Sequence, residues 1–207
     1  QRANGVIDCV VKDEEEGAAL AKKLMGYFQG EITDWTCEDQ RWLRRAVPEN
    51  RLHAYDMRHL INVFADTDSV VELRPDFAPG MITAFVRVEG RPLGLIANDP
   101  KVLGGAIDAA GADKASRFMQ LCDAFGVPMV SFCDTPGFMV GPEEEETAMV
   151  RHTCRMFVTA ASLTVPLFSL VTRKGYGLGA QGMTGGSFHA PFFCASWPSG
   201  EFGGMGL

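Results

Sequence analysis

The chain has 207 residues, of which 46% are hydrophobic, and a formal net charge of −7. This length suits one ordinary domain with a real core, and the negative charge argues against broad binding to nucleic acid or to an anionic membrane surface. No apolar run approaches the roughly 18 residues of a membrane-spanning helix.

A helix is predicted from Asp13 to about Gln29. Its first residues are acidic, which the positive end of the helix dipole favours. Residues 30–50 have mixed polarity, so we expect a connecting arm there and not a separate domain. Apolar residues recur in the helix at every fourth position and predict one buried stripe, made of Leu20, Leu24 and Phe28.

Asp56 predicts the start of a second helix, from Met57 to about Ala65, because an aspartate at this position caps free first-turn amides. From Val70 onward the pattern changes to strands. Segments 81–88 and 93–97 are separated by the tight turn Glu89-Gly90-Arg91-Pro92, which predicts an antiparallel hairpin. The helix residues that we expect to point inward are Leu60, Ile61 and Phe64.

The rest of the chain alternates helices with strands. Helices are predicted over 113–125 and 142–162, and buried strands over 127–133 and 165–171. Glycine-rich turns follow the strands, and such helix–strand–turn units predict an α/β organisation with helices covering strands. The apolar side of the helix over 113–125 consists of Phe118, Leu121, Cys122 and Phe125.

The six cysteines form no CxxC pair and show no cysteine–histidine spacing of a metal site. Cys122 and Cys133 lie inside apolar elements. We therefore expect reduced thiols, no metal, and a protein of the bacterial cytoplasm or of an organelle matrix. The chain has no initiator methionine and stops in the glycine-rich segment 203–207, so we expect a piece of a longer polypeptide.

The stretch Pro166 to Met183 carries the clearest functional pattern. An apolar strand runs into glycines at 175, 177 and 179, and this backbone can present bare amides that stabilise an oxyanion or a phosphate. A plain packing turn is a second interpretation. A third is the dinucleotide fingerprint Gly175-x-Gly177-x-x-Ala180 with Glu201 downstream, but the glycine-rich span that follows leaves no room for a long crossover helix.

The segment Asp134-Thr135-Pro136-Gly137 matches a GTPase switch, yet no G-x-x-x-x-G-K-[ST] loop precedes it. It predicts a turn, in which Gly137 and Phe138 could offer amides to a ligand. Glu143–Glu146 are explained by a solvated helix start, and no histidine has a serine or cysteine at a spacing that suggests a triad. Nothing in the sequence demands a side-chain nucleophile.

Taken together, motifs from about residue 5 to the end resemble the acyl-CoA carboxylase β-subunit family. They occur in the family's order, and as a set they are highly specific. They include Val47-Pro48-Glu49-Asn50, Tyr55-Asp56-Met57-Arg58, Gly90-Arg91-Pro92-Leu93-Gly94, Asp113-Lys114-Ala115-Ser116-Arg117-Phe118, Pro136-Gly137-Phe138, Thr172-Arg173-Lys174-Gly175-Tyr176-Gly177 and Trp197-Pro198.

The resemblance implies an α/β fold of the crotonase-like (ClpP/crotonase) type, a ββα superhelix, within a two-domain carboxyltransferase. Residues 1–50 would be the tail of the N-terminal domain with its connecting arm. Residues 51–207 would be most of the C-terminal, carboxybiotin-binding domain, truncated at its end. The family's backbone oxyanion pair falls on Gly179 and Ala180, and its biotin and substrate contacts on Pro136, Gly137, Phe138, Tyr176 and Gly177.

The activity implied is carboxyl transfer from carboxybiotin, borne on a carrier, to the α-carbon of a coenzyme A thioester. The implied partners are a biotin carboxylase, a biotin carrier component and further copies of the chain, with the active site at a dimer interface. Three alternatives stay open: a biotin-dependent decarboxylase, a biotin-free hydratase or isomerase using Glu143 or Glu201, and a non-catalytic biotin-docking module. We expect residues 1–207 alone to be inactive.

Overall fold

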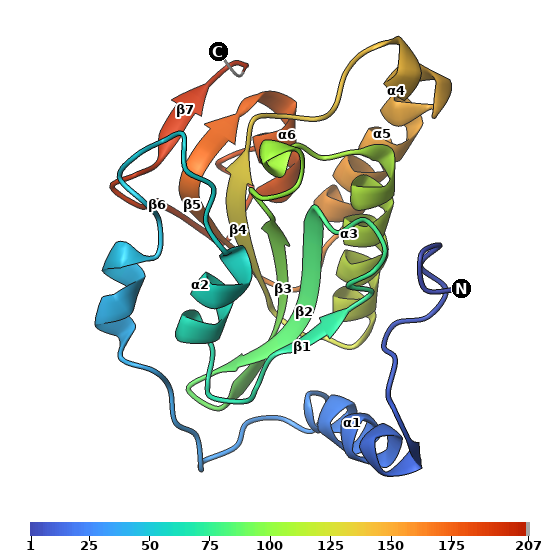
Figure 1. The fold of residues 1–207 in the computed structure, drawn as a ribbon, viewed down its shortest axis with the longest axis vertical. Coiled ribbons are helices and arrows are strands. Elements are labelled where there is room, and N and C mark those ends of the chain that lie inside the picture. Colours follow the sequence, from blue (N-terminus) through green and yellow to red (C-terminus); the bar gives the residue numbers. More distant parts are fainter. Residues whose placement is uncertain (206–207) are drawn as a thin grey trace.

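Seven strands form a single sheet in the computed structural model, which describes residues 1–205 (Figure 1). The order is β1-β2-β3-β4-β5-β6, and β7 pairs with the far end of β5. The first three strands are antiparallel, and all pairings from β3 to β7 are parallel. The strands are β1 Val71–Leu73, β2 Met81–Val88, β3 Arg91–Asn98, β4 Met129–Thr135, β5 Leu167–Tyr176, β6 Phe193–Ser196 and β7 Glu201–Gly203.

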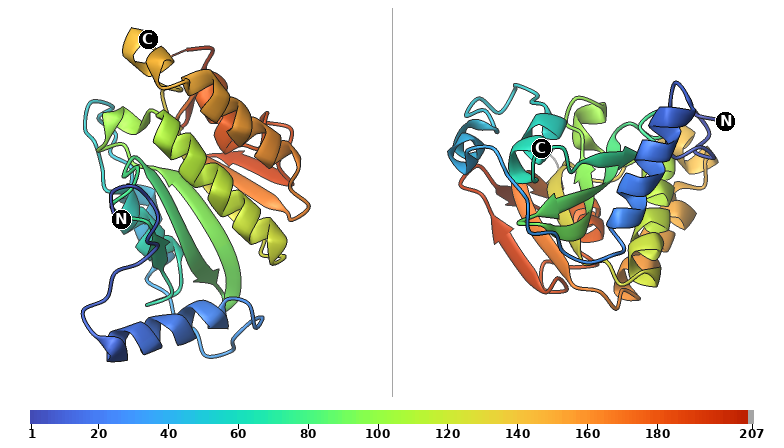
Figure 2. Two further views of the ribbon diagram at one scale, coloured as in Figure 1. Left: turned by 90° about the vertical axis from the view of Figure 1, so that its right-hand side faces the viewer. Right: turned by 90° about the horizontal axis from the view of Figure 1, so that it is seen from below.

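Helices cover both faces of the sheet (Figures 1 and 2). Helices α3, α5 and α6 lie on one face, and α2 lies on the other. Helix α1 lies apart, beside the end of the sheet near the β2–β3 hairpin. The helices are α1 Glu14–Gly26, α2 Met57–Phe64, α3 Ala109–Ala124, α4 Pro142–Glu146, α5 Met149–Ala161 and α6 Gly177–Met183, with short 3₁₀ helices η1 Gln40–Arg45 and η2 Leu103–Gly105.

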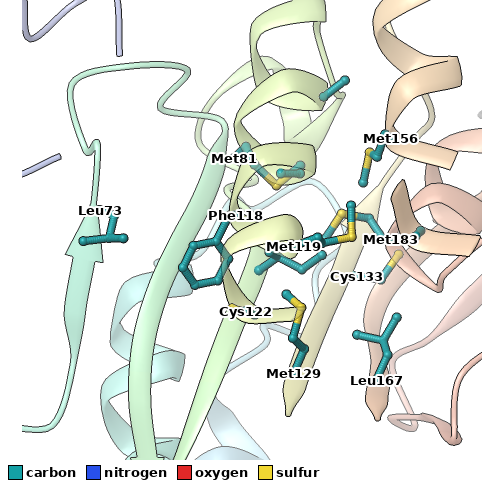
Figure 3. Close-up of a cluster of buried hydrophobic side chains, with 14 of the residues drawn as sticks. Leu73, Met81, Phe118, Met119, Cys122, Met129, Cys133, Met156, Leu167 and Met183 are labelled. Carbon is teal, nitrogen blue, oxygen red and sulfur yellow. The ribbon is translucent and has the colours of Figure 1, made fainter. Parts of the chain in front are cut away.

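The core between the sheet and α3, α5 and α6 is rich in sulfur (Figure 3). Its thioethers and thiols come from three helices and two strands. A second core, beneath α2, is built from aliphatic and aromatic side chains such as Leu60, Ile61 and Phe132. The predicted α/β organisation is therefore confirmed. The labelled sulfur residues are Met81, Met119, Cys122, Met129, Cys133, Met156 and Met183.

Two local predictions are confirmed by the backbone. Asp56 is the N-cap of α2 as predicted, and Asp13, predicted as the start of α1, proves to be its N-cap; each carboxylate accepts a first-turn N–H. The β2–β3 pair is the predicted antiparallel hairpin. Its turn is shorter than expected, because only Glu89 and Gly90 lie outside the ladder, with left-handed φ values of 51° and 78° that suit a two-residue turn.

The predicted buried stripe of α1 is wrong. No residue of the helix is fully buried, and Phe28, just after it, is 41% exposed. The helix lies at the rim, where Leu20 and Leu24 are only partly buried against the core, and the rings of Tyr27 and Phe28 pack on Phe85 at 5.4 and 5.5 Å. An amphipathic pattern predicts which side faces the protein, but not how deeply that side is covered.

Three other boundaries differ from prediction. The helix predicted over 142–162 is divided into α4 and α5 by Ala148, which has a left-handed φ of 59°. Helix α3 begins at Ala109 because Asp108 caps it, and Phe125 beyond its end is 61% exposed instead of buried. Strand β5 continues to Tyr176, since β7, which the sequence did not predict, extends the ladder there.

The described residues contain six free cysteines, and Cys122 and Cys133 are buried as predicted. Burial raises the pKa of the Cys122 thiol to about 12, which keeps it protonated and unreactive. No group of histidine, cysteine and acidic residues in the part of the chain that the structure describes could hold a metal ion. Within residues 1–205, no helix combines the length and the apolarity needed to cross a membrane.

Lys114 is a buried cation in α3, with only 1% of its surface exposed. Its ammonium donates to the main-chain carbonyls of Arg74, Phe77 and Ala78 at 2.8, 2.8 and 3.5 Å. These bonds fasten the loop between β1 and β2 to α3. Burial, which disfavours the charged form, lowers the pKa of Lys114 to about 8.

This pKa predicts how stability depends on pH. In the unfolded chain Lys114 has its usual pKa of about 10.4, so between about pH 8 and 10.4 the unfolded state binds more protons than the folded state. The contribution of this group to the free energy of unfolding therefore rises with pH, by about 3 kcal/mol in full. We expect the unfolding midpoint of the parent protein, measured relative to that of its Lys114→Met variant, to rise between pH 7 and pH 10. The exposed Lys22→Met variant is the control, and a pH-independent difference for Lys114→Met would contradict the prediction.

Candidate active site

The turn that joins β5 to α6 is built as an abrupt change of backbone direction. Tyr176 ends the strand and stands at the N-cap of α6, and Gly177 follows with a left-handed φ of 56°. The first-turn amides of an α-helix lack intrahelical partners, and those here belong to Gly177, Leu178 and Gly179. Gly179 and Ala180 are buried, whereas Leu178 is 62% exposed.

A second turn, which follows β4, touches this one. A Cβ placed on Gly179 would lie 2.6, 2.7 and 3.0 Å from the carbonyl carbon, Cα and oxygen of Gly137. Neither backbone could approach so closely if residue 179 carried a side chain. Gly137 has a φ of 137°, which also requires glycine. The structure thus brings together the two stretches that the sequence selected.

The chain around Gly137 is fixed by its own hydrogen bonds. Its N–H donates to the Thr135 hydroxyl at 3.1 Å, and its carbonyl accepts the Ile107 N–H at 3.1 Å. The expectation that the Gly137 amide is free for a ligand is therefore wrong. Phe138 packs on α6, 3.1 Å from where a Gly182 Cβ would stand. Pro136, Gly137 and Phe138 therefore form a fixed turn that lies against the start of α6, and we call these three residues the wall.

A buried ion cluster ties the ends of β4 and β5 together. Asp134 is fully buried and accepts from Arg173 Nε, from Lys174 Nζ and from the Lys174 main-chain N–H, each at 3.1 Å. The Arg173 guanidinium also lies over the Tyr55 ring, 5.0 Å from its centre. Burial, together with the charge of Asp134, raises the pKa of Tyr55. The two strand ends that carry the turns are thereby held in one register.

Tyr176 is held from its outer side. Its hydroxyl donates to Glu201 Oε2 at 2.8 Å, and the other oxygen of Glu201 meets Arg51 Nε at 2.7 Å. The hydrogen bond to Glu201 is the main reason that the pKa of Tyr176 is raised. Arg51, Arg173 and Glu201 line a cleft of about 700 Å³ between the arm and the β6–β7 segment, whose other walls include Arg44, Pro48 and Trp197.

These positions exclude a dinucleotide site at the turn. Helix α6 has seven residues and Glu201 is bonded to Tyr176, so the turn lacks the long crossover helix and the free ribose ligand of a dinucleotide site. Glu143 is exposed on α4. Sequence reasoning missed the roles of Asp134 and Arg51, since their partners depend on strand register and on the path of the arm, for which no motif gives a rule.

The chain is an α/β domain of the crotonase-like class. The parallel strands of its mixed sheet end in glycine turns, and one of these turns presents helix amides. The family model for the carboxyl transferase domain matches residues 1–206, and the chain belongs to that family.

Individual comparisons agree with this assignment. A solved single-chain, multi-domain long-chain acyl-CoA carboxylase superposes with a TM-score of 0.98 and 56% identity, over 100% of this chain and 21% of the other. The transcarboxylase 12S hexamer crystallised with methylmalonyl-coenzyme A gives a TM-score of 0.88 and 31% identity, over 99% and 41%. A biotin-dependent acetyl-/propionyl-coenzyme A carboxylase β6 subunit of Mycobacterium tuberculosis is 34% identical, over 99% of this chain and 44% of its own length. The chain spans about two fifths of the length of the curated relatives it matches.

Proposed function

We propose that the full-length protein transfers a carboxyl group from carboxybiotin to the α-carbon of an acyl-CoA. The observation that carries this proposal is the backbone contact between Gly137 and Gly179, which places a shaped wall against an amide-bearing helix start. Membership of the carboxyl transferase family and the biotin-dependent acyl-CoA carboxylases among its relatives support the same chemistry.

The proposed role of the turn is to stabilise negative charge on the ureido oxygen of biotin. That oxygen accepts hydrogen bonds, and the turn supplies neutral N–H donors with no competing charge between 175 and 182. The family resemblance assigned the donor pair to Gly179 and Ala180. Helix position favours Leu178 and Gly179, because Ala180 is the fourth residue of α6 and its amide is the first placed to bond within the helix.

Carboxybiotin supplies the carboxyl group and a ureido nitrogen that can take the α-proton, so no side-chain base is required. The chain's own residues bind and orient. Tyr176, fixed by Glu201, and the wall of Pro136, Gly137 and Phe138 border the turn on its two sides. Gly177 lets the chain turn sharply, with a Cβ there only 2.9 Å from the Gly204 carbonyl.

The reaction needs components beyond this chain. The acyl-CoA must reach within about 3–3.5 Å of the reacting carboxyl carbon, and we propose that another copy of the protein presents it across a dimer interface. Near the site, Leu178 and Val140 are apolar and strongly exposed, at 62% and 82%, as contact residues are before assembly. A biotin carboxylase and a biotin carrier component would deliver the carboxyl group.

The alternatives differ in what they ask of the site. A biotin-dependent decarboxylase would use the same amides in the reverse direction. A hydratase or isomerase would need a mobile carboxylate, but Glu201 is held by Arg51 and Tyr176. A docking module would need only the shape of the turns.

Decarboxylation separates a biotin-dependent enzyme, working in either direction, from the hydratase and from the docking module. We expect the full-length protein to release CO₂ from malonyl-CoA or methylmalonyl-CoA only when free biotin is present. Hydration of an enoyl-CoA without biotin would overturn the proposal in favour of a hydratase. Biotin binding without any turnover of either thioester would favour the docking module.

A further inference from the structure

A separate cavity of about 500 Å³ lies between α1, the β1–β2 pair and α3. None of its lining residues belongs to the candidate active site. Most of its lining is apolar or aromatic, which suits a ligand with a substantial apolar part. The apolar lining residues are Leu24, Phe28, Leu73, Phe85, Phe118, Leu121 and Phe125.

The mouth of the cavity carries an exposed aromatic pair. The rings of Phe28 and Phe125 lie 4.8 Å apart, and both residues are substantially exposed. Phe85, behind them, contacts Phe28 at 5.5 Å and Phe118 at 5.3 Å. An alkyl chain that lay against the exposed faces of Phe28 and Phe125 would remove apolar surface from water at about 25 cal/mol for each Å².

The charged side chains that line this cavity are mostly positive. Arg74 and Arg117 contribute two guanidinium groups, and Asp8 contributes one carboxylate. Asp8 pairs with Arg74 at 2.7 Å, but the Arg74 Nε has no hydrogen-bond partner among residues 1–205, and the side chain is only 11% exposed. Arg117 is exposed and forms no ion pair in the described part of the chain. The lining of this cavity therefore has an excess of positive charge beside an apolar interior.

Arg74 is held in place from both sides. Its φ of 55° is left-handed, its N–H donates to the Asp8 carbonyl at 2.7 Å, and its carbonyl accepts from Lys114 at 2.8 Å. A guanidinium with a fixed backbone loses little freedom when it binds an anion. Its fixed backbone distinguishes Arg74 from a surface arginine that merely lies near apolar residues.

We propose that this cavity binds a long-chain fatty acid, with its alkyl chain among the phenylalanines and its carboxylate beside Arg74 and Arg117. The apolar interior selects the chain, and the guanidinium excess selects a carboxylate over a neutral lipid. The site is distinct from the proposed carboxyl-transfer chemistry and does not depend on it.

The test uses the full-length protein and palmitate, kept below its aggregation concentration, with displacement of a dansylated undecanoic acid as the readout. We expect saturable binding with a Kd on the order of 1–10 µM. Arg117→Glu should weaken palmitate at least about tenfold, while leaving hexadecanol, which lacks the charge, unchanged. Leu121→Arg, which places a charged chain inside the cavity, should abolish binding of both.

Arg151→Glu, an equal charge reversal at an exposed position of α5, is the matched control and should bind palmitate like the parent protein. Arg117 is exposed, so its variant should fold even if Leu121→Arg does not. Absence of saturable binding, as when another part of the polypeptide fills the cavity, would overturn the proposal. Equal palmitate binding by the parent and Arg117→Glu proteins would overturn it as well.

Discussion

Gly179→Ala in the full-length protein should lower kcat for biotin-dependent decarboxylation by at least about 10²-fold. The new Cβ would lie 2.6–3.0 Å from three backbone atoms of Gly137, where no flexible side chain can give way. The turn and the wall must then separate, and the amides of Leu178 and Gly179 move with the turn. Displacements of about 1 Å in an active site commonly cost this much.

The matched control is Gly17→Ala in α1, where the added Cβ meets only an ordinary contact of 3.5 Å. It should leave kcat unchanged. Gly182→Ala offers a graded variant, because its Cβ would meet the Phe138 ring at 3.1 Å and a ring can shift. A folded Gly179→Ala protein with the parent rate would refute the role of the turn, and the intact near-ultraviolet circular dichroism of that variant would verify folding.

Asp134→Ala should give the largest loss of local stability. It leaves Arg173 buried without its carboxylate, and breaking one side of a buried ion pair costs about 3–5 kcal/mol. In hydrogen exchange followed by mass spectrometry, the amides of β4 and β5 should exchange faster by on the order of 10² or more, because local opening becomes easier.

Two controls frame that result. Asp134→Asn keeps the shape and an acceptor for the Lys174 N–H, so its effect should be smaller than that of alanine. Arg91→Ala breaks an exposed pair with Glu31 at 3.4 Å and should cost no more than about 1 kcal/mol. If Asp134→Ala exchanged like the Arg91 variant, the cluster would have no part in holding the strand ends.

Features that obey local rules could be predicted from the sequence. Asp13 and Asp56 cap their helices because a carboxylate accepts first-turn amides, and the β2–β3 hairpin follows from its turn residues. Both glycine turns were also identified, because glycine permits close backbone approach, as at Gly179, or a left-handed φ, as at Gly137.

Features that depend on distant partners could not be predicted. Ala148 adopts a left-handed conformation that alanine disfavours by roughly 1–2 kcal/mol, so only packing can explain the break between α4 and α5. The pairing of β7 with β5, the partners of Asp134 and the contact of Gly137 with Gly179 all join segments far apart in the sequence. Each depends on how distant strands align in the sheet, and the local sequence around each residue does not determine that alignment.

The sulfur-rich core has a consequence for the behaviour of the site under oxidation. Met183 belongs to α6, and Met156 Sδ lies 3.4 Å from where a Gly182 Cβ would stand, yet neither residue exposes any surface. A sulfoxide at either position would force a polar oxygen into apolar packing. Because both thioethers are fully buried, peroxide can reach them only when α5 or α6 opens locally, so their oxidation state reports how often the packing beneath the β5–α6 turn has opened.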